Sequence, residues 1–437
     1  MGILLTILYT ALFIFLIYTL GFFRDSGISR RSLTIVFILK ILSGFVMFVV
    51  YTKYYPDRQT ADIFKYYDDS EHIIEALPDA PWDYVRMVTG IGENSSDLEK
   101  YYVKMNHWHQ EYESNLYNDS HIIIRFNAIA RLFSFGVFHV HTIIMCFLSL
   151  FGLVALYRAF IPFFRNRLGV LFIGVFLLPS VIFWGSGVLK EGLLIFFMGM
   201  MIYHFFKTCS SKISFWSVFW IAASTFMMFY LKFYVLAMLI PGLIAWFWTS
   251  MTSNRKLVLK FVIVYFAYLG CSFLVKYGIP EYDPYWIIYV KQRDFLGLAQ
   301  EMQSGSMVPY LKLSSDPLNI LFAVPHSLFI VFIYPHIFQP FSALNFVAAV
   351  ENLFLSGMIV FVLIFRQKWK NIPIKPLLFA ICFVLGLYAL TGLTTPVAGA
   401  IVRYKVPALP FLLIACSSML DIDRLGKKFP WLRKLLQ

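Results

Sequence analysis

The sequence predicts an all-α fold: a polytopic transmembrane helical bundle of about 11 spans plus a re-entrant or broken segment, with a large helical first outer loop. Of its 437 residues, 59% are hydrophobic and 14% are charged, whereas soluble domains carry about 25% charged residues. Apolar runs long enough to cross a bilayer as a helix recur along the chain. The five cysteines all fall in or beside these runs, which argues against a disulfide framework.

The distribution of charge predicts the orientation of the bundle. Residues 52–121 hold 6 Lys or Arg and 14 Asp or Glu, a net charge of −8. The short loops that we assign to the cytoplasm hold, with the tail, 20 Lys or Arg and 3 acidic residues. By the positive-inside rule, the long acidic loop and the N-terminus lie outside. The net charge of +13 therefore reflects topology, and no nucleic-acid partner is expected.

Six regions follow from this pattern. They are the first two transmembrane helices (1–51), an outer periplasmic or lumenal loop with interfacial helices (52–135), transmembrane helices (136–275), a second outer loop (276–317), transmembrane helices with the re-entrant segment (318–420) and a basic cytoplasmic tail (421–437). The stretch Met1–Phe23 has no cleavage site and is expected to be retained as the first span.

The individual spans are justified by apolar runs bounded by basic turns. They are expected at 3–23, 32–51, 136–157, 168–184, 187–206, 214–230, 235–250, 261–275, 343–365, 376–390 and 406–420. Lys40, inside the second span, is expected to extend toward the inner surface. If Leu318–Pro340 also crossed fully, the basic residues after Phe365 would lie outside, so this proline-broken stretch is expected to be re-entrant or split.

Three aspartates near the start of the long loop are candidate general bases. Asp62, Asp68 and Asp69 lie within eight residues, just after the second span, with Tyr66 and Tyr67 between them. A partly desolvated carboxylate at a membrane surface can take a proton from an acceptor hydroxyl. Asp62 is favoured because it stands closest to the membrane, although an acidic outer loop without chemistry explains the same pattern. A divalent metal is also possible.

That metal has no assigned ligands. His107 and His109 are the nearest histidines, but their i, i+2 spacing is a weak signal. Glu351-Asn352 lies inside a span and is read either as a functional site or as a helix–helix hydrogen bond.

Several cations are expected to gather around one rim at the outer leaflet. Such a rim suits an anionic ligand, because the arginine fork matches phosphate oxygens, while ordinary extension of basic side chains from helix ends is the alternative. The candidates for substrate binding are Tyr66, Tyr67, Arg125, Arg131, Lys190, Glu191, Lys232, Arg403 and Tyr404.

In this layout the chain resembles the GT-C membrane glycosyltransferases. Spans are followed by a large first outer loop with an early Asp, here Asp62…Tyr66-Tyr67…His72-Ile-Ile, and by an interfacial helix that enters a span at Arg125–Tyr157. Later landmarks are similar in Leu178-Pro-Ser-Val-Ile-Phe-Trp-Gly-Ser-Gly-Val-Leu-Lys-Glu191, Phe229-Tyr-Leu-Lys232…Pro241 and Arg403-Tyr-Lys-Val-Pro-Ala-Leu-Pro410. The chain departs from the pattern in an extra span before the loop and in the absence of a clean Asp-Glu pair.

The resemblance implies transfer of a sugar from a polyprenyl-phosphate-linked donor to a glycan, lipid or protein acceptor on the outer face. The first-loop Asp would be the base, and the anomeric carbon would be inverted. The expected location is a multi-pass protein of the bacterial inner membrane with a periplasmic active face, acting in polysaccharide biosynthesis of the cell envelope.

Two other functions stay open. A polysaccharide polymerase or ligase of the O-antigen type would depend on arginines, with Arg403, Arg125 and Arg293 as candidates. A transporter of lipid-linked glycans would show broken helices, as expected at Leu318–Pro340. A purely structural membrane protein is the remaining alternative.

Overall fold

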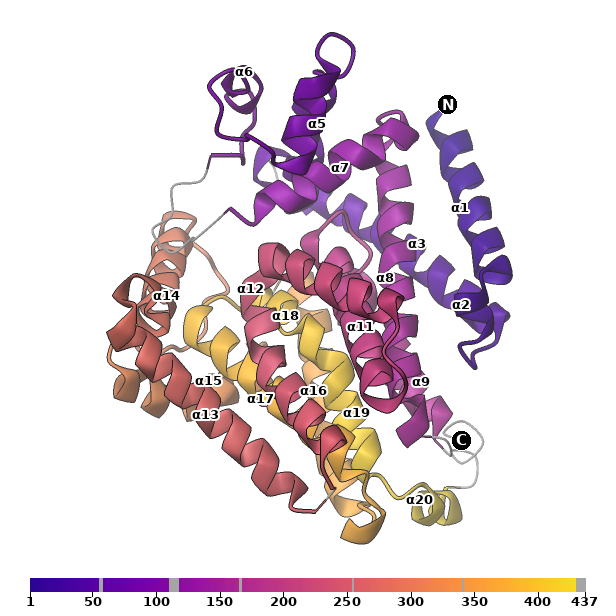
Figure 1. Cartoon of the computed structure of the whole chain (residues 1–437), viewed down its shortest axis with the longest axis vertical. Coiled ribbons are helices and arrows are strands. Elements are labelled where there is room, and N and C mark those ends of the chain that lie inside the picture. Colours follow the sequence, from indigo (N-terminus) through magenta and orange to yellow (C-terminus); the bar gives the residue numbers. More distant parts are fainter. Residues whose placement is uncertain (55–57, 110–117, 165–166, 254, 340–341, 430–437) are drawn as a thin grey trace. The chain divides into compact units, whose positions relative to one another are not determined.

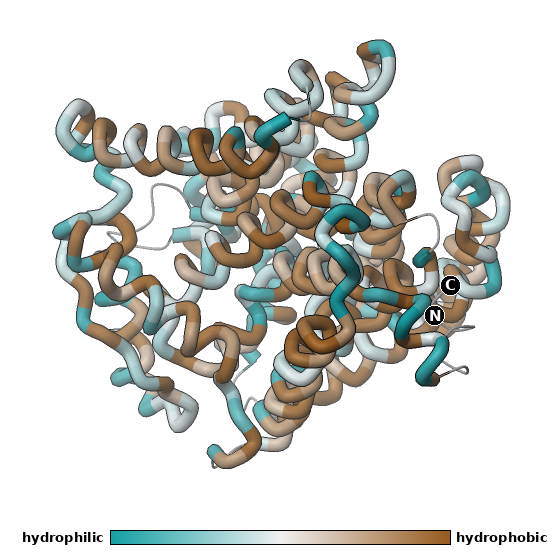
Figure 2. The backbone as a smooth tube through the Cα atoms, turned by 90° about the horizontal axis from the view of Figure 1, so that it is seen from below, coloured by the Kyte–Doolittle hydropathy of each residue, from teal (hydrophilic) through white to brown (hydrophobic). Residues whose placement is uncertain are grey.

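The computed structural model describes all residues except 55–57, 110–117, 165–166, 254, 340–341 and 430–437. The described residues form helices and connecting turns, with isolated backbone bridges at Met307–Val397 and Arg366–Leu420 but no strand. Hydrophobic residues dominate long parts of the helical tube, and hydrophilic ones occupy shorter segments (Figure 2). Within the described residues, nine helical segments are long and apolar enough to cross a membrane. The chain is therefore an all-α, multi-pass membrane protein.

These candidate spans correspond to most of the predicted ones. They are Gly2–Thr19, Arg30–Lys53, Phe138–Phe163, Lys190–Ser210, Phe215–Met251, Leu257–Gly278, Ala343–Ile364, Ile374–Thr394 and Ala398–Met419. The segment Pro317–Ile333 is a shorter apolar helix of 17 residues.

Three segments are shorter or less regular than the other candidate spans. Residues 168–184, predicted as one span, form two short helices, α9 (Leu168–Phe176) and α10 (Pro179–Trp184), because the proline ring disfavours helical backbone just before it. The predicted spans 214–230 and 235–250 correspond to the two helical parts of α12 (Phe215–Met251), which meet at a kink where Lys232 has non-helical backbone angles. The helix α15 (Pro317–Ile333) ends before Pro335, and Pro340 lies outside the described residues.

The chain divides into two compact units, and the first comprises residues 1–158, 182–203 and 218–233. Its helices, shown from indigo to magenta in Figure 1, are α1 (Gly2–Thr19), α2 (Gly21–Arg24), α3 (Arg30–Tyr54), α4 (Asp62–Ile74), α5 (Pro81–Thr89), α6 (Glu99–Tyr102), α7 (Ser120–Ser134), α8 (Phe138–Phe160), α11 (Lys190–Ser210) and the first part of α12. The short 3-10 turn η1 (Arg58–Thr60) precedes α4.

Within the first unit, the described residues 58–134 form what we call the first-loop lobe. Tyr66, Met87, Trp108 and Ile123 are among the buried residues of its core. The same core includes Met145, Leu193 and Leu231 of α8, α11 and α12, so the lobe packs on the ends of apolar helices. The N-terminal helix reaches the same place, because the Tyr9 hydroxyl donates to the Phe133 carbonyl oxygen at 2.7 Å.

Close backbone packing joins α8 and α11 below the lobe. A Cβ atom on Gly152 would lie 2.4 Å from the Ile195 carbonyl oxygen, and one on Gly199 would lie 2.0 Å from the Gly152 carbonyl oxygen. Glycine is therefore required at both positions, as at many close helix crossings in membranes. This contact fixes the start of α11, where Lys190 and Glu191 stand.

The second unit comprises residues 159–181, 204–217 and 234–437. Its helices are α9, α10, the second part of α12, α13 (Leu257–Gly278), α14 (Pro284–Glu301), α15, α16 (Ala343–Ile364), α17 (Ile374–Thr394), α18 (Ala398–Tyr404), α19 (Leu409–Met419) and α20 (Ile422–Lys428). Its centre is α17, which packs against α15 and α19, while α19 also packs against α9. The helix α14 lies in the predicted second outer loop.

Candidate functional site

Helix α4 carries the candidate bases and begins at Asp62, after η1. Its apolar side chains recur with helical spacing and bury one face, while Asp62 and Lys65 stay partly exposed in the first turn. The buried residues are Ile63, Phe64, Tyr66, Tyr67, Asp69, Ser70 and Ile73. A carboxylate in the first turn is favoured by the unpaired N–H groups there, which gives Asp62 a stable place at the helix start.

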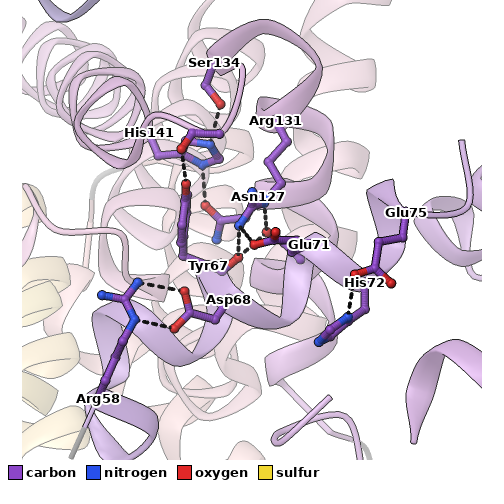
Figure 3. A network of polar contacts seen from close by, with 12 residues as sticks. Arg58, Tyr67, Asp68, Glu71, His72, Glu75, Asn127, Arg131, Ser134 and His141 are labelled. Carbon is purple, nitrogen blue, oxygen red and sulfur yellow. Dashed lines mark hydrogen bonds and ion pairs between the residues drawn. The ribbon is translucent and has the colours of Figure 1, made fainter. Parts of the chain in front are cut away.

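The three aspartates have different environments. The Asp62 Oδ1 lies 2.5 Å from the Lys65 Nζ, with the two side chains 25% and 16% exposed. Asp68 accepts two bonds of 2.8 Å from the Arg58 guanidinium (Figure 3). Asp69 is 1% exposed, and its two oxygens accept from the backbone N–H groups of Asn106 at 3.0 Å and His107 at 2.9 Å. Asp69 is thus a structural acceptor and Asp68 is held by both bonds of a guanidinium group, whereas Asp62 is partly exposed and paired with a lysine.

Two ammonium groups lie close to the ring of Tyr66. The Lys65 Nζ is 5.2 Å and the Lys190 Nζ is 5.0 Å from the ring centroid. Lys190 also binds the Asp119 carboxylate at 2.7 Å. We call Asp62, Lys65, Tyr66, Asp119 and Lys190 the Tyr66 cluster. Lys65 was missed in the sequence, although its i, i+3 spacing from Asp62 was a signal.

The charges of the Tyr66 cluster act on one another. Burial is the largest single influence and lowers the pKa of Lys65, but the Asp62 carboxylate and Tyr66 together raise it by more, so the pKa lies above its ordinary value. The positive charge of Lys190 acts in the opposite direction on the same ammonium group. The cluster is therefore one electrostatic unit, in which a change at one charge is felt by the others.

Arg131 and Tyr67 join α4 to α7 (Figure 3). The Arg131 guanidinium, 8% exposed as a residue, donates to the Ser70 hydroxyl at 2.8 Å and to the Tyr67 carbonyl oxygen at 2.9 Å. It also lies 4.1 Å from the Tyr67 ring centroid, while the Tyr67 hydroxyl donates to the Gly136 carbonyl oxygen at 2.5 Å. These bonds fix the orientation of α4.

Arg125 has a similar structural role. Its Nε donates to the Met87 carbonyl oxygen at 2.9 Å, and its guanidinium pairs with the Glu93 carboxylate and lies 5.4 Å from the Trp108 ring centroid. Arg125 and Arg131 therefore hold the first-loop lobe together. Their partners in the structure differ from those of Lys190, with which the sequence predicts them to form one cationic rim.

Lys232 and Glu191 form a buried pair at the break in α12. The Lys232 Nζ lies 2.6 Å from the Glu191 Oε1, and the side chains are 5% and 0% exposed. Lys232 has non-helical backbone angles (φ −157°, ψ 82°) inside α12. Intramembrane charges of this kind mark functional sites or buried pairs. The neighbours Lys190 and Glu191 thus have different partners.

Arg403 and Tyr404 belong to the second unit. The Tyr404 ring lies 6.2 Å from Tyr234 and 6.3 Å from Phe295, measured between ring centroids, so the start of the last span packs beside α14. These two candidates remain unassigned to a ligand.

The residue after them, Lys405, is buried and donates to the Asn352 side-chain oxygen. The Asn352 amide donates to the Pro335 carbonyl oxygen at 3.0 Å. Glu351 accepts from the Ser180 backbone N–H at 3.0 Å and from the Ser180 hydroxyl. Of the two interpretations of Glu351-Asn352, hydrogen bonding between helices is the one that these contacts support.

The histidines considered as metal ligands have different partners. The His107 Nδ1 lies 3.6 Å from Asp69, whereas the His109 Nε2 lies 3.1 Å from Glu99. Among the described residues, no group of three or more His, Cys, Asp or Glu side chains is arranged to hold a metal ion.

Comparison of the chain with family models, with curated proteins and with solved structures finds no match. Its function must therefore be argued from its own residues, and the Tyr66 cluster is the arrangement with the clearest chemistry.

Proposed function

We propose that this protein is a membrane glycosyltransferase that moves a sugar from a polyprenyl-phosphate-linked donor to an acceptor, with Asp62 as the general base. The observation that supports it is the Tyr66 cluster, where a partly exposed carboxylate is paired with Lys65 and the ammonium groups of Lys65 and Lys190 both lie near the Tyr66 ring. Asp62, Lys65 and Tyr66 belong to a loop that directly follows an apolar helix long enough to span a membrane, and Lys190 begins another such helix, so a lipid-borne donor can reach the cluster.

In the proposed reaction, Asp62 takes the proton of the acceptor hydroxyl as its oxygen attacks the anomeric carbon. The new bond joins that oxygen to the carbon, while the bond from the carbon to the donor phosphate oxygen breaks and its electron pair leaves with the phosphate. Attack from the opposite side inverts the carbon. The ammonium groups of Lys65 and Lys190 stabilise the charge that develops on the leaving phosphate.

The proposal puts the first-loop lobe on the periplasmic side of a bacterial inner membrane. Its support is the net charge of −8 in residues 52–121 and the basic character of the short loops and tail that we assign to the cytoplasm. Arg125 and Arg131 act in it as supports of the lobe, whereas Arg403 and Tyr404, which belong to the second unit, are given no role in it.

The test is sugar transfer by the purified protein in a detergent without phosphate, with polyprenyl-phosphate-linked donors and mass-spectrometric detection of the product. Asp62→Asn is expected to lower turnover by about 100-fold or more, the contribution of a general base. Asp68→Asn is the matched control, because Asp68 lies on the same helix but is held by Arg58. Equal turnover in the Asp62 variant and the native protein would exclude Asp62 as the base.

A second candidate, transport of lipid-linked glycans, is favoured by the break in α12 at the Glu191–Lys232 pair. Broken helices with charged partners surround the substrate sites of many transporters. Flux of a lipid-linked glycan across liposomes without a covalent product would support transport. An arginine-dependent polymerase or ligase has less support, because Arg125 is already bonded to Met87 and Glu93 within the lobe.

A further inference from the structure

The charges of the Tyr66 cluster balance in the structure. Lys65 pairs with Asp62 and Lys190 with Asp119, while both ammonium groups remain within 5.2 Å of the Tyr66 ring centroid. The side chains of Lys65 and Lys190 are 16% and 6% exposed, so these charges are partly withdrawn from water. Shielded charges interact more strongly than exposed ones, and an incoming anion would compete directly with the two carboxylates.

We infer that Lys65 is a positioning residue that holds Asp62 in an ion pair until a phosphate ester draws its ammonium group away. The phosphodiester of a polyprenyl-phosphate-linked sugar carries a charge of about −1, and the monoester that leaves after transfer carries about −1.5 to −2. Either can compete with the Asp62 carboxylate for the ammonium group of Lys65. The ligand class is therefore a phosphate ester, and the inference rests on the proposed function for the identity of that ester as the donor.

The released state is structurally feasible for both partners. Lys65 has a flexible four-carbon stem with rotatable donors, so its ammonium group can move without a change in the backbone of α4. Asp62 keeps its place in the first turn of α4, where the helix N-terminus favours a negative charge after Lys65 has moved. After the exchange, the Asp62 carboxylate is therefore still stabilised by the helix N-terminus, and the Lys65 ammonium group is stabilised by the phosphate.

The exchange would couple binding of the donor to activation of the base. A carboxylate bonded to an ammonium group accepts a proton less readily than the same carboxylate without that partner. Asp62 would therefore become an effective base only when the phosphate of the donor occupies the cluster. This order of events makes a specific prediction, since removing the Asp62 charge should abolish the base and yet strengthen phosphate binding.

The ion pair of Asp68 with Arg58 provides the control. It stands on the same helix, but it is more exposed, at 35% and 53%, and its two bonds are held by a rigid guanidinium fork. Replacement of Asp68 by Asn removes the same charge from α4 as replacement of Asp62. A general effect of net charge on phosphate binding would therefore be equal in the two variants.

The experiment is calorimetric titration of the full-length protein, in a detergent whose head group contains no phosphate. The titrants are a short-chain polyprenyl phosphate and, separately, inorganic phosphate. Asp62→Asn is expected to bind polyprenyl phosphate about fivefold more tightly, the factor that corresponds to an ion pair of about 1 kcal/mol. Asp68→Asn should stay within about twofold of the native protein, and Lys65→Met should weaken binding about tenfold or more, with recovery in Lys65→Arg.

Unchanged or weaker binding by Asp62→Asn, or equal tightening in Asp68→Asn, would overturn the inference. The same order of affinities with inorganic phosphate alone would support the exchange and assign the site to the phosphate group rather than to the lipid. If Lys65→Met does not fold, the two aspartate variants still test the exchange, because the inference predicts tighter phosphate binding for Asp62→Asn but not for Asp68→Asn.

The outcome is separable from that of the proposed function. Tighter phosphate binding by an Asp62→Asn variant that still transfers sugar would retain the exchange and remove Asp62 as the base. Loss of transfer with unchanged phosphate affinity would retain the base and remove the exchange.

Discussion

Glu191 and Lys232 form an ion pair with an Oε1–Nζ distance of 2.6 Å, and neither side chain is more than 5% exposed. Lys232 interrupts α12 at the same point, so the pair stands where backbone groups of a long apolar helix lose their regular partners. Two charges in such a place are tolerated only together, because each neutralises the other in surroundings without water.

This relationship predicts a non-additive effect on stability. Glu191→Gln or Lys232→Met alone is expected to lower the free energy of unfolding by about 3–5 kcal/mol, because the remaining buried charge loses the oppositely charged group that pairs with it. The double variant should recover most of that loss. The measurement is a double-mutant cycle from unfolding titrations in detergent micelles. The exposed pair Arg24–Asp25 is the control, with an expected coupling of about 1 kcal/mol or less. Additive losses at Glu191 and Lys232 would contradict a direct pair.

Asp69 is expected to be a structural residue. Asp69→Ala removes the acceptor of the Asn106 and His107 backbone N–H groups, and the free energy of unfolding should fall by about 2–4 kcal/mol, because two part-buried donors lose a charged acceptor. Hydrogen exchange of those two amides should accelerate in this variant. Asp68→Ala should leave both amides unchanged, since Asp68 is paired with Arg58. Equal exchange in the native and Asp69→Ala proteins would show that the bonds do not form.

Lys40 is expected to lower the free energy of unfolding relative to an apolar residue at the same position. Its side chain is fully buried, and its Nζ has no hydrogen-bond partner among the described residues. The expected extension toward the inner surface is therefore wrong. Lys40→Met keeps the length of the side chain and removes the buried donor, so it should raise the free energy of unfolding by about 1–3 kcal/mol. A lower melting temperature for Lys40→Met in the same detergent would indicate that Lys40 has a stabilising partner.

His121 is expected to make the first-loop lobe sensitive to acid. Burial lowers the pKa of His121 below its ordinary value of 6.5 and outweighs the bond to the Trp108 carbonyl oxygen, which raises it. The unfolded chain therefore binds the His121 proton more readily than the folded protein. The stability that comes from burying a neutral His121 is present at neutral pH and is lost as the pH falls below about 6.5.

The measurement is the rate of amide exchange in α7 between pH 7 and pH 5, corrected for the intrinsic rate at each pH. In the native protein, protection should fall with acidification, and in His121→Gln this fall should be smaller. The glutamine amide can still donate to the Trp108 carbonyl oxygen, so the variant keeps the bond and removes the titration. Identical pH profiles would contradict the assignment to His121.

Much of the membrane-spanning architecture could be predicted from the sequence, because the length of an apolar run and the signs of its flanking charges are local properties. The prediction failed where helix continuity depends on a single residue, because Pro179 divides residues 168–184, which were expected to form one span. The predicted boundary at Lys232 corresponds to a kink in α12. Whether a charged residue in an apolar run forms a turn or a break depends on its partner, here Glu191, which lies 41 positions away.

The candidate site was less predictable for the same reason. Asp62 could be selected by its place after a span, but the roles of Arg125 and Arg131 depend on Glu93 and Ser70, whose positions in space follow only from the fold. The spacing of Lys65, three residues after Asp62, already allows an ion pair on a helix. Such a pair between neighbouring residues is ordinarily an exposed surface feature, so the spacing alone did not indicate a functional residue. The proximity of Lys65 to Lys190 gives it a further role, and that contact is not local.

The most direct test of the account is sugar transfer by Asp62→Asn compared with Asp68→Asn, measured as turnover of a polyprenyl-phosphate-linked donor by purified protein. We predict that turnover falls by about 100-fold or more in the Asp62 variant. Turnover of the Asp68 variant should stay within about threefold of the native protein. Full turnover by Asp62→Asn, or an equal loss in both variants, would contradict the account.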